Sequence, residues 1–311
     1  MKTIVIALGG NALQEKGQQP TYENQLRVIE NTAKLIAPLA RDHRLLVVHG
    51  NGPQVGRILI QNEYAVSQTP SNPLYACGAM SQGLIGYPLQ QALSEAMRAE
   101  GIDKTAATVL TQVAVSPDDP GFQHPSKPIG PFFTKEEADK LVKERGYVMK
   151  EDAGRGYRRV VASPDPLRIV EMPAILALVE QGMVPVCVGG GGIPVVEKEG
   201  RLCGADAVVD KDLAAERLAE GVNADVLLTL TAVEKVSLNY QKPDQQDLSC
   251  VTPEEVKAYM AQGHFAPGSM LPKMKAALRF AESRKGRVSI VTSLSHAGNA
   301  LGGTVGTRIE A

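Results

Sequence analysis

Short, unbroken apolar runs alternate with stretches of helical periodicity along most of the chain. Runs rich in Val, Ile and Leu are typical of strands buried on both faces, and helices between them indicate a mostly parallel sheet covered on both sides. The pattern therefore predicts an α/β fold. The clearest predicted strands span residues 3–8, 44–48, 184–188, 226–230 and 288–292, and an early helix spans 24–37 and is stopped by Pro38.

One segment, from about 116 to 166, departs from this alternation. It is rich in Pro, Gly and charged residues, and it contains a short charged helix near 135–145. Loops of this length are usually either functional or disordered. The composition fits an inserted subdomain that projects from the sheet and a plain surface loop equally well. The 311 residues have room for one large domain or two medium ones.

Composition and charge exclude several classes of function. Lys and Arg number 33 against 34 Asp and Glu, a net charge of -1, which argues against a surface built to bind nucleic acid. No apolar stretch approaches the roughly 18 residues of a membrane span, and the first apolar run is too short for a signal peptide. The four cysteines have no metal-ligand or redox spacing, so we expect reduced thiols in a soluble, cytoplasmic protein without nucleic-acid or membrane partners.

Glycines follow two predicted strands at places where a ligand could approach the backbone. Residues 9–11 (Gly-Gly-Asn) precede a segment that can form a helix, and residues 50–52 (Gly-Asn-Gly) precede Pro53, which suits a first helical turn. Ligands bind at the carboxyl ends of parallel strands, and N–H groups at a helix start attract anions. One such cluster is usually a plain tight turn, but several at one edge favour a phosphate site. The P-loop motif is missing, and the glycine spacing misses the dinucleotide-binding pattern by one residue.

Two lysines are expected near helix starts, the unfavourable end of a helix for a cation. Lys211 lies between Asp210 and Asp212, just before a helix predicted over 213–219, and either aspartate could cap that helix. Lys273 opens a second helix after a Pro-Gly-Ser segment. A bound polyphosphate would make both positions favourable, whereas ordinary solvated lysines would need no ligand. The pattern leaves both interpretations open.

An ordered set of motifs resembles the carbamate kinase family over essentially the whole chain. The resemblance implies the amino-acid-kinase fold, a three-layer αβα sandwich in one domain of residues 1–311, with a mobile lid at about 116–166. It implies a homodimer that transfers a phosphoryl group reversibly between ATP and carbamate, giving ADP and carbamoyl phosphate with Mg²⁺, often toward ATP synthesis in nitrogen-compound breakdown. The motifs lie at residues 7–12, 49–56, 77–83, 127–132, 158–161, 189–194, 210–212, 230–236 and 265–273.

The resemblance also implies roles for individual residues. Phosphoryl transfer depends mainly on positioning and charge neutralisation, so lysines and N–H groups are expected around the transferring group. Asp210 would orient the lysines, and Lys127 would reach in from the lid. The implied substrate-binding residues are Gly9, Gly10, Gly50, Asn51, Gly52 and Lys127, the implied catalytic residues are Asn11, Asp210, Lys211 and Lys273, and the implied nucleotide-binding residues are Lys211, Thr231, Val233 and Lys273, with no metal ligand from the protein.

One departure from the family and two other functions remain open. The family's Pro-Ser-Pro-Lys-Pro is here Ala-Ser-Pro-Asp-Pro at 162–166, which places the negative charge of Asp165 at the lid hinge. A related kinase of amino-acid carboxylates, such as aspartate or acetylglutamate, would share much of the pattern. A catalytically silent protein that binds carbamoyl phosphate or nucleotide is the third possibility.

Overall fold

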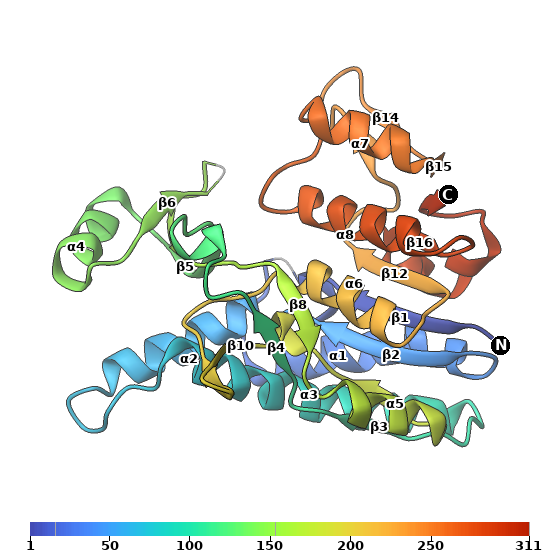
Figure 1. Ribbon diagram of the computed structural model, residues 1–311, viewed down its shortest axis with the longest axis horizontal. Helices are drawn as coiled ribbons and strands as arrows, with labels where there is room; N and C mark the ends of the chain where they lie inside the picture. Colours follow the sequence, from blue (N-terminus) through green and yellow to red (C-terminus); the bar gives the residue numbers. More distant parts are fainter. Residues whose placement is uncertain (16, 153, 311) are drawn as a thin grey trace.

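An eight-stranded sheet lies at the centre of the computed structural model, which describes residues 1–15, 17–152 and 154–310 (Figure 1). The strands from β16 to β3 run parallel, and β17 and β15 at one edge run opposite to them, which confirms the predicted mostly parallel sheet. In spatial order the strands are β15 (Cys250–Val251), β17 (Thr307–Glu310), β16 (Val288–Ser293), β12 (Val226–Thr231), β1 (Thr3–Leu8), β2 (Arg44–His49), β9 (Val184–Val186) and β3 (Ala106–Thr108).

Helices cover both faces of this sheet because successive side chains of each buried strand point to opposite faces. In β1, Ile4 and Ile6 belong to one hydrophobic core, whereas Val5 and Ala7 belong to another. Both faces are apolar, so each needs its own cover, and the predicted sandwich of helices around the sheet is confirmed. The first core is closed by α1 (Tyr22–Ile36) and α3 (Leu74–Ala99), and the second by α5 (Met172–Glu180), α6 (Lys211–Gly221) and α8 (Met270–Ser283).

Several predicted boundaries differ from the structure by one or two residues, and two differences near the glycine loops have clear local reasons. The strand predicted over 184–188 ends at Val186, because Val188 has a φ of 55° that takes the chain out of extended geometry. After the first glycine loop only a 3-10 turn forms (Gly10–Ala12), and α1 begins at Tyr22, where the Thr21 side chain accepts from the Asn24 N–H. The first loop is therefore followed directly by a 3-10 turn rather than by α1. The second loop does precede an α-helix, since α2 (Gly52–Tyr64) begins there with Pro53 in its first turn.

The Pro- and Gly-rich segment forms a separate small unit, here called the inserted subdomain (residues 116–165). It leaves a second sheet after β4 (Gln112–Val115) and returns to the same sheet at β8 (Pro166–Ile169), and it projects to the left of the main sheet (Figure 1). The expected charged helix is α4, which begins with a Thr134 capping box. The second sheet contains β11 (Arg201–Gly204), β10 (Ile193–Lys198), β4 (Gln112–Val115) and β8 (Pro166–Ile169), and the inserted subdomain contains β5 (Lys127–Phe133), β7 (Tyr157–Val161), β6 (Met149–Glu151) and α4 (Lys135–Arg145).

Short strands, one helix and several 3-10 turns complete the fold. No helix in the described residues is long and apolar enough to cross a membrane. The short strands β13 (Ser237–Leu238) and β14 (Gln246–Asp247) and helix α7 (Pro253–Ala261) pack near α8, and 3-10 turns span Ala37–Ala40, Pro120–Phe122, Gly189–Gly191 and Leu294–Gly302.

A buried carboxyl group on α6 makes the stability of the fold depend on pH. Glu216 is inaccessible to solvent, and neither of its carboxyl oxygens has a hydrogen-bond partner within the described parts of the chain. Burial, reinforced by the nearby Glu220, raises the pKa of Glu216 from 4.5 to about 8. The folded protein therefore keeps a proton that the unfolded chain has lost across this window. Its stability should fall as pH rises through the window, by at most about 1.4 kcal/mol per pH unit.

The variant Glu216→Gln is expected to lose this contribution, because an amide of the same shape does not titrate. Urea unfolding at pH 5 and pH 8 checks this, with the wild-type protein losing more unfolding free energy between the two values than the variant. Equal losses in both proteins would show that Glu216 is ionised in the folded state.

Candidate active site

The first two glycine loops meet at one edge of the main sheet. The parallel pairing of β1 with both β2 and β12 brings the ends of these three strands together. The first loop is attached to β12, because the Gly9 N–H donates to the Leu230 carbonyl at 2.8 Å and the Asn11 amide donates to the Thr231 carbonyl at 2.9 Å. Residues about 220 positions apart in the chain therefore form one edge of the site.

The glycine run that follows β9 packs against the second loop. Gly190 has a φ of 68°, and a Cβ atom there would lie 2.1 Å from the Asn51 amide, so a larger residue would be excluded. Asn51 is buried and donates to the Ser81 hydroxyl at 2.8 Å. His49 is also buried beneath this run, and burial lowers its pKa to about 4, so the ring is neutral near pH 7. His49 thus supports the loops and carries no charge for catalysis.

These loops enclose a small cavity of about 190 Å³. It combines backbone N–H groups at the start of α2 with lysine side chains, which is the chemistry that binds an anion. Six of the residues expected at the substrate or phosphoryl group lie together in its wall, and Gly9 and Asn11 belong to the loop that carries one of them. The six are Gly10, Gly50, Asn51, Gly52, Lys127 and Lys211.

A larger cavity, of about 500 Å³, lies beyond the end of β12. It contains Thr231, Val233 and Lys273, three of the four residues that the resemblance assigned to nucleotide binding, whereas the fourth, Lys211, lines the small cavity. Its wall mixes apolar and polar groups, as a site for a base, a sugar and phosphates would require. Sequence reasoning missed several lining residues that lie outside the motifs: Ser237, Asn239, Lys242 and His264. Lys235 and Phe265 also line the cavity and lie within motifs, but neither was assigned a role.

Asp212 joins the two cavities. Its carboxylate accepts from Lys211 Nζ at 2.8 Å through one oxygen and from Lys273 Nζ at 2.9 Å through the other. Lys211 lies in the wall of the small cavity and Lys273 in the wall of the large one. Each cavity therefore has a cation fixed at its border by the same carboxylate.

Asp212, rather than its neighbour Asp210, accepts the hydrogen bonds of Lys211 and Lys273. The expectation that Asp210 orients these lysines stays a prediction, because Asp210 acts on both only through its nearby charge. Asp210 instead caps α6, accepting from the Asp212 N–H at 2.9 Å, and forms an ion pair with Lys127 of the inserted subdomain. Side chains two residues apart at a helix start face different neighbours, so Asp212 is turned toward α8. The acid–base–acid triplet was the only signal in the sequence that could have identified it.

Burial and ion pairing set the charge of this cluster. Burial lowers the pKa of Lys211, and Asp212 opposes that effect. Burial also disfavours the charge of Lys273, but Asp212 outweighs it and the pKa of Lys273 is raised. Although burial by itself would raise the pKa of Asp212, Lys211 and Lys273 hold it well below its usual range. With Lys127 included, three lysines face two aspartates, and the excess positive charge suits a polyphosphate.

Lys127 reaches this cluster because the inserted subdomain packs closely on α2. A Cβ atom at Gly56 of α2 would lie 2.4 Å from the Gly130 Cα atom of β5, so only glycine allows this approach. A second contact anchors the subdomain, since Tyr147, Arg145 and Arg159 all reach Glu63 of α2. In this structure the subdomain therefore lies against α2 and brings Lys127 to the wall of the small cavity.

The fold and these paired cavities define a class of enzymes. The chain belongs to the amino acid kinase family, whose sequence model matches residues 2–292, and it is a phosphotransferase. Within that family it is similar to carbamate kinases, and the resemblance found in the motifs is confirmed.

Two curated relatives and one solved structure illustrate this similarity. The carbamate kinase of Clostridium perfringens is 53% identical over 98% of this chain and 99% of its own length. That of Thermococcus kodakarensis is 49% identical over 99% of each chain. The structure of carbamate kinase from Giardia lamblia bound to AMP-PNP superimposes with a TM-score of 0.91 at 43% identity, covering 99% of this chain and 98% of the other.

Proposed function

We propose that this enzyme transfers a phosphoryl group reversibly between carbamoyl phosphate and ADP, forming carbamate and ATP. The observation that carries the proposal is the Asp212 bridge, which holds Lys211 at a small anion cavity and Lys273 at a nucleotide-sized one. The similarity to carbamate kinases supports the choice of substrate. The small cavity favours a short acceptor such as carbamate over aspartate or acetylglutamate.

The residues of the site act by positioning and charge. N–H groups of the two glycine loops, with Asn11 supporting the first, surround the phosphoryl group between the cavities. An oxygen of the ADP β-phosphate attacks phosphorus as the bond to the carbamate oxygen breaks, and Lys211 and Lys273 offset the charge on the transferring and attacking oxygens. Carbamate leaves as an anion, so no side chain has to transfer a proton.

Mg²⁺ fits this site as a companion of the nucleotide. Within the described residues, no group of three or more His, Cys, Asp or Glu side chains gathers as a metal site. Mg²⁺ commonly binds through one or two carboxylates together with substrate phosphates. The ADP or ATP phosphates would hold the ion, Asp210 would orient a water on it, and the ion would offset phosphate charge.

The proposal extends to direction and compartment. We place the working direction toward ATP synthesis during the breakdown of nitrogen compounds, as in the family the chain resembles. The enzyme would work in the cytoplasm, where nucleotides are available and where the free thiols Cys77, Cys187, Cys203 and Cys250 stay reduced.

A coupled assay tests the proposal. Purified protein with carbamoyl phosphate, ADP and Mg²⁺ should form ATP, and omission of any one reactant should stop it. Folded protein without activity above background would refute the proposal. A panel with ATP and carbamate, aspartate or acetylglutamate identifies the acceptor, and calorimetric binding of carbamoyl phosphate without turnover would indicate a silent binding protein.

The inserted subdomain acts in this proposal as a lid within a single domain, and Lys127 is its contact with the substrate. The variant Lys127→Ala should raise the KM for carbamoyl phosphate about 10- to 100-fold, because a hydrogen bond to a charged group contributes about 1.5–3 kcal/mol. Binding of ADP, measured by calorimetry, should stay near the wild-type value. A loss of ADP affinity instead would place Lys127 at the nucleotide.

A homodimer is the proposed assembly, with a second copy packed on the outer face of α3. Met80, Leu84 and Tyr87 are exposed there at helical spacing, close to the edge strand β3. An apolar stripe beside an open sheet edge suits a two-fold interface. The variant Tyr87→Glu should therefore shift the mass measured by light scattering from dimer to monomer, whereas the wild type should stay dimeric. A monomeric wild-type protein would contradict the assembly.

A further inference from the structure

Asp165 lies at the point where the inserted subdomain returns to the core. It directly precedes β8, which pairs antiparallel with β4, the strand after which the subdomain begins. Both connections of the subdomain therefore lie side by side. The negative charge that distinguishes this segment in the sequence is located at the base of the lid.

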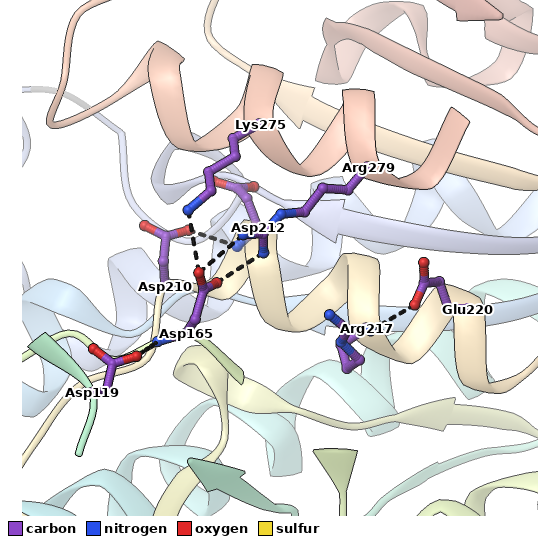
Figure 2. Close-up of polar contacts among 8 residues, drawn as sticks. All are labelled: Asp119, Asp165, Asp210, Asp212, Arg217, Glu220, Lys275 and Arg279. Atoms are coloured by element: carbon purple, nitrogen blue, oxygen red, sulfur yellow. Dashed lines mark hydrogen bonds and ion pairs between the residues drawn. The ribbon is translucent and has the colours of Figure 1, made fainter. Parts of the chain in front are cut away.

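The Asp165 carboxylate bridges from this base to helix α8 (Figure 2). It accepts from both terminal nitrogens of Arg279, at 2.8 and 2.9 Å, and from Lys275 Nζ at 3.3 Å. Lys275 and Arg279 are four residues apart and share one face of the helix. The Arg279 guanidinium holds the pKa of Asp165 below its usual range, so the bridge is charged at neutral pH.

A second contact makes the bridge act on both connections. The Asp165 N–H donates to the Asp119 carboxylate at 3.0 Å (Figure 2). The other oxygen of Asp119 accepts from the Gly121 N–H at 2.7 Å. Asp119 belongs to the outgoing connection and Asp165 to the returning one. A displacement of the Asp165 side chain would therefore move both connections of the subdomain.

The helix at the other end of the bridge carries a lysine of the site. Lys273 lies two residues before Lys275 on α8 and contacts Asp212, whereas Lys127 lies on β5 of the lid and contacts Asp210. A movement of α8 at the nucleotide would therefore reach the lid through Asp165. In an enzyme that must close over two substrates, such a connection links their binding.

We propose that Asp165 is a positioning residue that couples nucleotide binding at α8 to closure of the lid over the phosphoryl donor. The proposal rests on the proposed function for the identity of that donor. Arg279 also has a second carboxylate near its charge, because Glu220 of α6, like Asp165, raises its pKa. When the Asp165–Arg279 ion pair opens, the charge of Arg279 is therefore still partly offset, as a reversible contact requires.

Initial rates measured over a grid of ADP and carbamoyl phosphate concentrations test the coupling. In the wild type, saturating ADP should lower the KM for carbamoyl phosphate by about fivefold or more, the usual lower range for coupled sites. In Asp165→Asn this ratio of KM values should approach one, and Asp165→Glu should restore part of the wild-type ratio. Adding Arg279→Gln to Asp165→Asn should cause no further change. The control Asp118→Asn, an exposed aspartate in the same connection, should keep the wild-type ratio.

Hydrogen exchange provides a readout that needs no turnover. ADP with Mg²⁺ alone should slow amide exchange in β5 of the wild type and of Asp118→Asn, but not of Asp165→Asn, with thermal melting confirming that each variant is folded. Wild-type protein without ATP formation would refute the proposed function and leave this exchange comparison valid. An unchanged KM ratio in Asp165→Asn, or no effect of ADP on β5 in the wild type, would overturn the coupling.

Discussion

Replacement of Lys273 or Lys211 by alanine is expected to lower kcat by about two to four orders of magnitude. The estimate follows from the loss caused by removing one fixed donor to developing charge in a site that excludes water. Both lysines are largely buried and held by one carboxylate, so their charges need little reorganisation during the reaction. A surface lysine could not replace them, because it would be solvated and mobile.

The coupled assay at saturating substrates measures this loss. Lys257→Ala is the matched control, because that lysine is exposed on α7 and pairs only with Glu282 among the salt bridges of the described residues. Its kcat should equal the wild-type value. An unchanged kcat in Lys273→Ala or Lys211→Ala would remove that lysine from the mechanism.

Replacement of Asp212 by asparagine should cause the second large effect, on both stability and catalysis. Loss of one member of a buried ion pair typically costs about 3–5 kcal/mol, because the remaining charge stays buried without a partner. Here two lysines lose the same partner. The lysine side chains would also lose their fixed positions, so kcat should fall by about 100-fold or more.

The pH dependence of this variant separates charge from shape. Burial lowers the pKa of Lys211, and Asp212 provides the main opposing effect. Without Asp212 the pKa of Lys211 falls further, and the charged form is retained only at lower pH. The kcat of Asp212→Asn relative to the wild type should therefore be higher at pH 6 than at pH 8.

Acid unfolding of the wild type and of Asp212→Asn gives an independent check on the charge of Asp212. The pKa of Asp212 is depressed by folding, so its contribution is present above the unfolded value of about 3.8 and is lost as pH falls below it. Acid unfolding should therefore begin at higher pH in Asp212→Asn, because the variant starts with less stability to lose. Asp103→Asn, at an exposed site, should behave as the wild type. Equal pH profiles in Asp212→Asn and the wild type would show that Asp212 does not set the charge of the lysines.

Much of the site was predictable because its glycine loops and lysines lie beside strong local signals. A buried apolar run followed by glycine indicates a strand end in any α/β protein, and parallel strands place their ends at one edge. The positions of Gly10, Gly50, Asn51 and Gly52 in one cavity follow from this rule. The roles of individual aspartates did not follow, because Asp210 and Asp212 have the same local pattern on either side of Lys211.

Sequence patterns predicted the sheet, the helices that cover it and the inserted segment, and they indicated the residues expected to bind phosphate. These features depend on periodicity and on turn residues, which act over a few positions. Which charges meet could be seen only in the folded molecule. Asp212 pairs with a lysine 61 residues away, and Asp165 pairs with an arginine 114 residues away. Such contacts depend on how helices pack across the sheet, and a side chain's local sequence does not specify its partner there.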